Sequence, residues 1–155
     1  AEWYRPFIEW KSERNENGIS RETAKYQRAL MLGEYEYVMR GTEKLLDSFP
    51  DDEEITLLNI TARSSLVAMA GLEKRVKLLS DNFRIINEAM KTAPKKYNYL
   101  LYYRGLTRLG MNDPEGAKED FEASLKLDPR FEPSMLILKG MENAETLAAD
   151  KNKLS

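Results

Sequence analysis

Two short amphipathic segments joined by a turn, residues 97–131, constrain the fold of this chain more than any other stretch. The second segment opens on Asp113 and Pro114, because aspartate caps free N–H groups at a helix start and proline lacks one there. It stops at Asp128 and Pro129, since a residue before proline is pushed out of the α conformation. Between them, small or apolar residues recur at helical spacing, namely Ala117, Phe121, Ser124 and Leu125. The stretch therefore predicts a helical hairpin.

The first helix of this hairpin is expected over about residues 96–109, with Gly110 as its natural end. It carries two apolar stripes. They are Leu101 with Gly105, and Tyr99, Tyr102 and Tyr103 with Leu106. Side chains about four and seven positions apart return to the same side of a helix, so Tyr99, Tyr103 and Leu106 share one face.

The spacing in this hairpin resembles the tetratricopeptide repeat, an antiparallel helix pair of 34 residues. The first helix of that family has a large apolar residue and then a small one four positions later, here Leu101 and Gly105. The second helix has alanine, then an aromatic residue four positions later and a proline eight further on. These are Ala117, Phe121 and Pro129. The resemblance implies that the small residues let the two helices approach closely, with the aromatic ring filling the wedge between them.

Three positions of the hairpin depart from the family pattern. Leu101 stands where the family has tryptophan, Arg104 where a leucine is expected, and Arg108 where a tyrosine is expected. A match over one repeat is moderately specific, and it gains weight only from a recurrence of the same spacing.

The same spacing recurs, imperfectly, upstream of Pro94 and Pro50. Counted back from Pro94 the matching positions are Ile86, Asn82, Ala70 and Leu66, and counted back from Pro50 they are Thr42, Val38, Tyr26 and Glu22. From Pro50 to Pro94 there are 44 residues, so the middle repeat carries roughly ten more than the 34-residue unit. We place them at the front of its first helix, from Glu53 to Ala62. Apolar spacing also predicts one helix from Glu53 to about Leu79.

The resemblance implies one all-α domain over residues 1–155, a right-handed superhelical stack of about three helical hairpins with flanking helices. The expected parts are a leading helix in 1–18, repeats in 19–52, 53–96 and 97–130, and a capping helix in 131–155. An ordinary helical bundle with the same spacing is the alternative. In the leading helix, Trp3, Phe7 and Trp10 have helical spacing. They either cover the open end of the first repeat or form an aromatic partner site.

Composition narrows the functions that such a chain can have. A net charge of −2, from 24 basic and 26 acidic residues, gives no electrostatic basis for binding nucleic acid. No apolar run approaches the ~20 residues that cross a bilayer, so we expect no membrane insertion. The chain has no cysteine and no histidine, which excludes disulfides, thiolate zinc sites and the commonest general base. A cysteine-free chain suits a cytoplasmic or an exported setting, and we expect no enzymatic activity, metal or cofactor.

The candidate binding residues follow from the resemblance. The first helix of each tetratricopeptide repeat lines a concave groove, so Tyr99, Tyr103 and Leu106 would face that groove, with Arg63 as a polar anchor. Tyrosine suits such a surface because it buries a large area and keeps a polar tip. The alternative is that these rings pack against neighbouring helices. A terminal-carboxylate clamp of the chaperone-binding members is not expected, because its basic and amide positions hold Thr23, Gln27 and the two tyrosines.

The resemblance implies a protein–protein interaction scaffold that binds a peptide or a protein segment in the groove. One alternative is a structural or assembly role, with a homo-oligomer formed through the apolar surfaces. The other is a secretion-type chaperone, since some of these are similar small three-repeat proteins.

Overall fold

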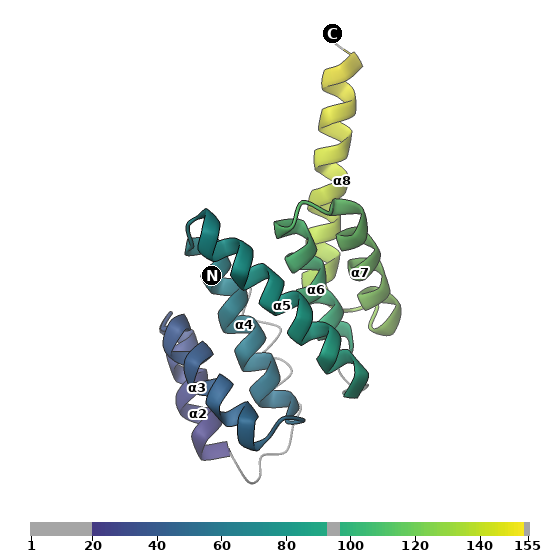
Figure 1. The fold of residues 1–155 in the computed structure, drawn as a ribbon. Helices are drawn as coiled ribbons and strands as arrows, with labels where there is room; N and C mark the ends of the chain where they lie inside the picture. The colour runs from purple at the N-terminus through teal and green to yellow at the C-terminus, as the bar shows by residue number, and fades with distance from the viewer. Residues whose placement is uncertain (1–19, 93–96, 154–155) are drawn as a thin grey trace.

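The described residues of this computed structural model, 20–92 and 97–153, form seven α-helices and no strand (Figure 1). The helices are α2 (Ser20–Met31), α3 (Tyr35–Ser48), α4 (Glu53–Met69), α5 (Leu72–Thr92), α6 (Tyr97–Gly110), α7 (Pro114–Leu127) and α8 (Glu132–Lys153). The all-α expectation is confirmed. The expected leading helix with Trp3, Phe7 and Trp10 lies outside the described residues, as does Pro94.

Each helix packs against the next one along the chain, and α4 also contacts α2 and α6. Helix α4 therefore has four neighbours and lies at the centre of the molecule (Figure 1). Its sequence explains this position, because apolar and small residues surround the whole helix instead of forming one stripe. From Glu54 to Leu66, only Thr56 and Ser64 are not buried.

Local signals in the sequence position the ends of the helices. The side chain of Asp52 accepts a hydrogen bond of 2.9 Å from the N–H of Ile55 at the start of α4. Asp113 accepts one of 3.0 Å from the N–H of Gly116 and is followed by proline at the start of α7, as expected. Gly33, in the turn between α2 and α3, has φ +82°, a conformation that glycine adopts without strain.

The close approach expected within the third hairpin is confirmed. A Cβ atom added to Gly105 on α6 would lie 2.5 Å from Cε1 of Phe121 on α7. The first hairpin, α2 and α3, has the same kind of contact with the glycine on its second helix. There Gly41 on α3 faces the ring of Tyr26 on α2. In both hairpins, glycine leaves room for an aromatic ring between two helices.

The expectation of one helix from Glu53 to about Leu79 is wrong. Helix α4 ends at Met69, Ala70 is extended with φ −87° and ψ 150°, and α5 begins two residues later. The apolar spacing continues across this break through Met69 and Val76, which are exposed, and spacing alone does not record that the chain has turned back.

The extra length of the middle hairpin lies mainly in its second helix. Helices α4 and α5 have 17 and 21 residues, whereas α6 and α7 have 14 each. Placing the additional residues at Glu53 to Ala62 was therefore wrong. Ala70, which we expected at the small position inside the first helix, instead follows the end of α4. A hydrogen bond from the side chain of Asn82 on α5 to Oγ of Ser64 on α4 links the two helices.

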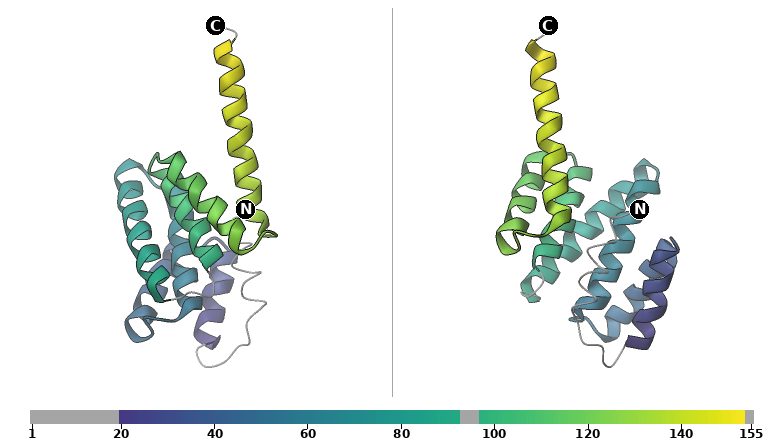
Figure 2. Two further views of the ribbon diagram at one scale, coloured as in Figure 1. Left: turned by 90° about the vertical axis from the view of Figure 1, so that its right-hand side faces the viewer. Right: turned by 180° about the vertical axis from the view of Figure 1, so that it is seen from behind.

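Helix α8 packs on α7 only with its first half, where Ser134 and Leu138 are buried. Every residue from Glu142 to Lys153 is exposed. Figure 2 shows this half rising beyond the other helices in both views. Among the described helices, none is long and apolar enough to cross a bilayer.

Candidate protein-binding surface

The tyrosines expected to face a groove lie in the core. Tyr99 is 4% exposed and Tyr103 is fully buried, so neither ring is accessible to a partner. Tyr99 packs edge-on against Phe131 at 5.0 Å between ring centroids, and Tyr102 packs against Tyr103 at 5.2 Å and Phe131 at 5.7 Å. This corrects the expectation of an open groove at these residues. The alternative, that the rings pack against neighbouring helices, describes their position.

Burial also controls the charge of these phenols. It raises the pKa of Tyr102 to about 12, and it raises the pKa of Tyr103 above its ordinary value. Both side chains therefore keep their proton to higher pH than an exposed tyrosine does, and they serve as large apolar groups with one polar atom each.

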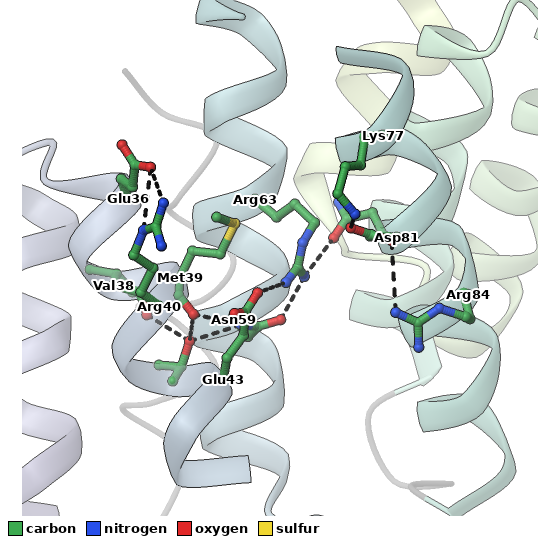
Figure 3. Close-up of polar contacts among 12 residues, drawn as sticks. Glu36, Val38, Met39, Arg40, Glu43, Asn59, Arg63, Lys77, Asp81 and Arg84 are labelled. Atoms are coloured by element: carbon green, nitrogen blue, oxygen red, sulfur yellow. Dashed lines mark hydrogen bonds and ion pairs between the residues drawn. The ribbon is translucent and has the colours of Figure 1, made fainter. Parts of the chain in front are cut away.

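Arg63 is not a free anchor for a partner, because its side chain is 2% exposed and both of its terminal nitrogens are hydrogen-bonded within the protein (Figure 3). Its Nη1 donates to Oδ1 of Asn59 at 2.6 Å and to Oδ1 of Asn82 at 3.4 Å. Its Nη2 donates to Oε1 of Glu43 at 2.9 Å. Burial lowers the pKa of Arg63, and the charge of Glu43 opposes that shift. The guanidinium thus links α3, α4 and α5.

Two amides extend this buried network. The side chain of Asn59 donates to the backbone oxygen of Met39 at 3.1 Å and to Oγ1 of Thr42 at 3.0 Å. The side chain of Asn82 donates to Oγ of Ser64 at 2.8 Å. A buried charge is tolerated only where partners satisfy it, and the carboxylate of Glu43 together with the two amides does so for the guanidinium on α4.

The two arginines that depart from the repeat pattern form a second network of the same kind. Arg104 binds both carboxylate oxygens of Asp120, with Nε at 3.0 Å and Nη2 at 2.8 Å. Its Nη1 also donates to Oδ1 of Asn87 at 3.0 Å. Arg108 adds a bond of 3.0 Å to Oδ2 of Asp120 and lies over the ring of Phe83. Arg104 links α5, α6 and α7 as the buried arginine of α4 links α3, α4 and α5.

Leu106 lies at a surface cavity of about 250 Å³ between α4, α5 and α6. Four of its eight lining residues are apolar and four carry a hydroxyl or amide group, but the surface that they expose to the cavity is mainly apolar. The lining residues are Ser64, Ser65, Val67, Ala68, Leu79, Asn82, Leu106 and Thr107. Of the four expected site residues, the structure places only Leu106 at a cavity that solvent reaches.

Exposed apolar side chains adjoin this cavity. Leu72 is 77% exposed and Val76 is 61% exposed, and both share a face of α5 with Leu79, which lines the cavity. Met69, at the end of α4, is 66% exposed. The sequence contained the signal for this patch, an apolar residue at steps of four and three. The expectation of one continuous helix concealed it, because that helix placed Met69 and Val76 on the same stripe as the buried residues of α4.

Within residues 20–92 and 97–153, no three Asp or Glu side chains are grouped so that they could hold a metal ion. Comparison with protein-family models, with curated proteins and with solved structures finds no match to this chain.

Proposed function

We propose that this chain is a protein-interaction scaffold that holds an apolar side chain of a partner in the cavity at Leu106. The observation that carries the proposal is that exposed Leu72 and Val76 share a face of α5 with Leu79, which lines the cavity, and that exposed Met69 directly follows Ala68, which also lines it. Isolated apolar residues are common on protein surfaces, but a cluster beside an apolar cavity is typical of a binding site.

We further propose that the helices form a right-handed superhelical stack of three hairpins of the tetratricopeptide type. The contacts of α2 with α4 and of α4 with α6 support this arrangement, because the first helices of successive repeats adjoin in such a stack. The glycine-to-ring contact of Gly105 with Phe121 also supports it. The binding surface then lies near the end of the middle hairpin and along α6, and does not include the tyrosine rings.

The cavity suits a leucine, methionine or phenylalanine side chain. Burying such a side chain contributes roughly 1.5–3 kcal/mol, enough for specificity though not for tight binding alone. The hydroxyl of Ser65 and the amide of Asn82 lie among the apolar lining groups, where polar atoms of a bound peptide could meet them. Met69 beside them is unbranched and adapts to different partner shapes.

Peptide selection tests the proposal even though the partner is unidentified. Peptides selected from a displayed random library on the intact chain are labelled, and their affinities are measured by fluorescence anisotropy. The Leu72→Glu/Val76→Glu variant should bind them at least tenfold more weakly, because charge enters the apolar patch at two exposed, fold-tolerant positions.

The matched control is Leu127→Glu, which adds a charge at a 58% exposed position at the end of α7, away from the cavity. Its affinity should stay within twofold of the original chain. Equal binding by the double variant and the original chain would refute the proposed surface.

Self-association is a second candidate, and the projecting half of α8 favours it. Leu147, in the outer half of α8 where every described residue is exposed, is itself 69% exposed, and Leu136, in the half that packs on α7, is 57% exposed. An isolated helix of this length is marginal in water, so a partner helix would stabilise it. Solution mass measured from low to high micromolar concentration tests this. A rise that Leu136→Glu/Leu147→Glu abolishes supports self-association, and a monomeric mass throughout opposes it.

A further inference from the structure

A second surface cavity lies at the other end of α5 and takes no part in the site at Leu106. Its volume is about 290 Å³, and α3, α4, α5, α6 and the turn before α4 contribute to it. Apolar residues, buried or half-buried, line it together with more exposed charged residues. The apolar ones include Leu46, Leu57, Ile85, Ala89 and Leu100, and the charged ones are Asp51, Glu53, Arg84 and Glu88.

The charges at this cavity are not balanced. Glu88 pairs with Lys91 at 3.0 Å. Figure 3 shows Arg84 beside Asp81, at 3.8 Å between Nη2 and Oδ1. The side chains of Asp51 and Glu53, in contrast, have no hydrogen bond or ion pair with any part of the chain that the structure describes. Two carboxylates that are unpaired within the described residues thus stand beside an apolar cavity, where Arg84 is the one basic residue among the described lining residues.

The segment of chain that carries these two carboxylates contains no cation of its own. No lysine or arginine occurs between Lys44 and Arg63, whereas five acidic residues do. Two of the five have structural roles, because Asp52 caps α4 and the buried Glu54 accepts a hydrogen bond from Gln27. Capping of α4 therefore explains Asp52, and the helix dipole favours Glu53 in the first turn, but neither effect gives the carboxylates of Asp51 and Glu53 a partner.

We propose that this cavity docks a basic, apolar segment of a partner protein. A leucine-sized side chain enters between Leu57, Ile85 and Ala89, and a lysine or arginine within one helical turn of it reaches Asp51 and Glu53. Long basic side chains fit this role because they lay an aliphatic stem on apolar surface while the charged end stays in water. The carboxylates act mainly by steering and selecting the segment, since exposed ion pairs are individually weak.

The inference is tested with four labelled twelve-residue peptides and the intact chain. The first is a serine- and alanine-rich helix former with one leucine and, four positions later, one lysine. In the second, glutamate replaces the lysine, and in the third, serine replaces the leucine. The fourth, residues 142–153 of this chain, contains Leu147 and Lys151 at the same spacing. The first peptide should bind at least fivefold more tightly than the second and third, and its affinity should fall in 0.5 M salt.

Protein variants then locate the site. Asp51→Asn/Glu53→Gln should weaken the first peptide about fivefold at low salt, roughly what two exposed ion pairs supply. The control Glu73→Gln/Glu119→Gln removes two exposed charges elsewhere, leaves the same net charge, and should change affinity less than 1.5-fold. Ala89→Phe fills the cavity and should weaken binding tenfold or more. Thr92→Trp, at an exposed lining position, is the second variant in case Ala89→Phe does not fold.

Three results would overturn the inference. Equal loss in both charge variants means that net charge alone attracts the peptide. Undiminished binding with the filled cavity means that the leucine docks elsewhere. Tighter binding of the fourth peptide, together with a solution mass that rises with concentration and falls in Asp51→Asn/Glu53→Gln, means that the occupant is a second copy. The Leu72→Glu/Val76→Glu variant should leave this binding unchanged, which separates this inference from the function proposed above.

Discussion

A single missing methyl group at Gly105 lets α6 and α7 approach each other. We predict that Gly105→Ala lowers the free energy of unfolding by about 2 kcal/mol, because the new Cβ would lie 2.5 Å from Cε1 of the buried Phe121 ring. That loss exceeds the gain of about 1 kcal/mol in helix propensity from glycine to alanine. Urea unfolding followed by circular dichroism measures the difference.

Gly140, on α8, is the matched control for this change. It lies inside a helix with no atom within 4 Å of the position that a Cβ would take. Gly140→Ala should therefore raise helicity and cost no stability, because only the propensity term remains. Similar destabilisation by the two substitutions would show that the contact with the aromatic ring is not what excludes a side chain at Gly105.

The carboxylate of Asp120 holds two arginines, and we predict that Asp120→Asn costs roughly 2–3 kcal/mol of stability. An amide offers one acceptor oxygen and no charge, so Arg104 and Arg108 lose their counter-ion while they remain largely buried. The exposed pair of Glu36 with Arg40 provides the comparison, and Glu36→Gln should cost about 0.5 kcal/mol or less. Chemical denaturation measures the free energy of unfolding of both variants. Equal losses would contradict the prediction that the buried carboxylate contributes more to stability than the exposed one.

At the level of helices, sequence reasoning was accurate wherever a local chemical signal marks an end. Asp113 with Pro114 begins α7, and Gly33 separates α2 from α3, as expected. It was wrong at Ala70, where no capping side chain or proline marks the turn between α4 and α5. The local mark there is Gly71, a residue that commonly follows a helix end, but the apolar spacing that runs past it favoured one continuous helix.

The outer half of α8 provides a prediction about one element. A chain that ends after Met141 should keep its free energy of unfolding within about 0.5 kcal/mol, because residues 142–153 are all exposed. Leu138→Ala, in the half that packs on α7, should cost roughly 2–3 kcal/mol through lost burial and a cavity. Thermal and urea unfolding of both forms measure this. A truncated chain that is much less stable would mean that the outer half has a partner in solution.

In the molecule as a whole, whether a side chain is buried or exposed depends on how many helices surround it. Resemblance to a regular repeat assigned Tyr99, Tyr103 and Arg63 to a groove, but α4 and α6 have neighbours that bury all three. Sequence alone does not distinguish these positions, since tyrosine and arginine serve equally in cores and at surfaces when their polar atoms are satisfied. Leu106 is only partly buried, and it lines a cavity at the surface.

The buried phenols predict how the whole fold responds to alkaline pH. Burial raises the pKa of Tyr102 to about 12, against about 10 in an unfolded chain, and also raises that of Tyr103. Between these pH values the unfolded chain has lost the proton and the folded chain keeps it. The contribution of these phenols to the free energy of unfolding is therefore fully present below pH 10. It falls above pH 10, by up to about 1.4 kcal/mol per pH unit for each phenol.

Phenolate absorbance from these two residues should appear only as the helical signal is lost. In the Tyr102→Phe/Tyr103→Phe variant, the free energy of unfolding should fall less steeply with pH. The comparison is made by expressing each protein's free energy of unfolding relative to its own value at pH 8. If the absorbance of the original chain completes its rise while the helical signal stays intact, these rings are open to solvent and the core assigned to α6 is wrong.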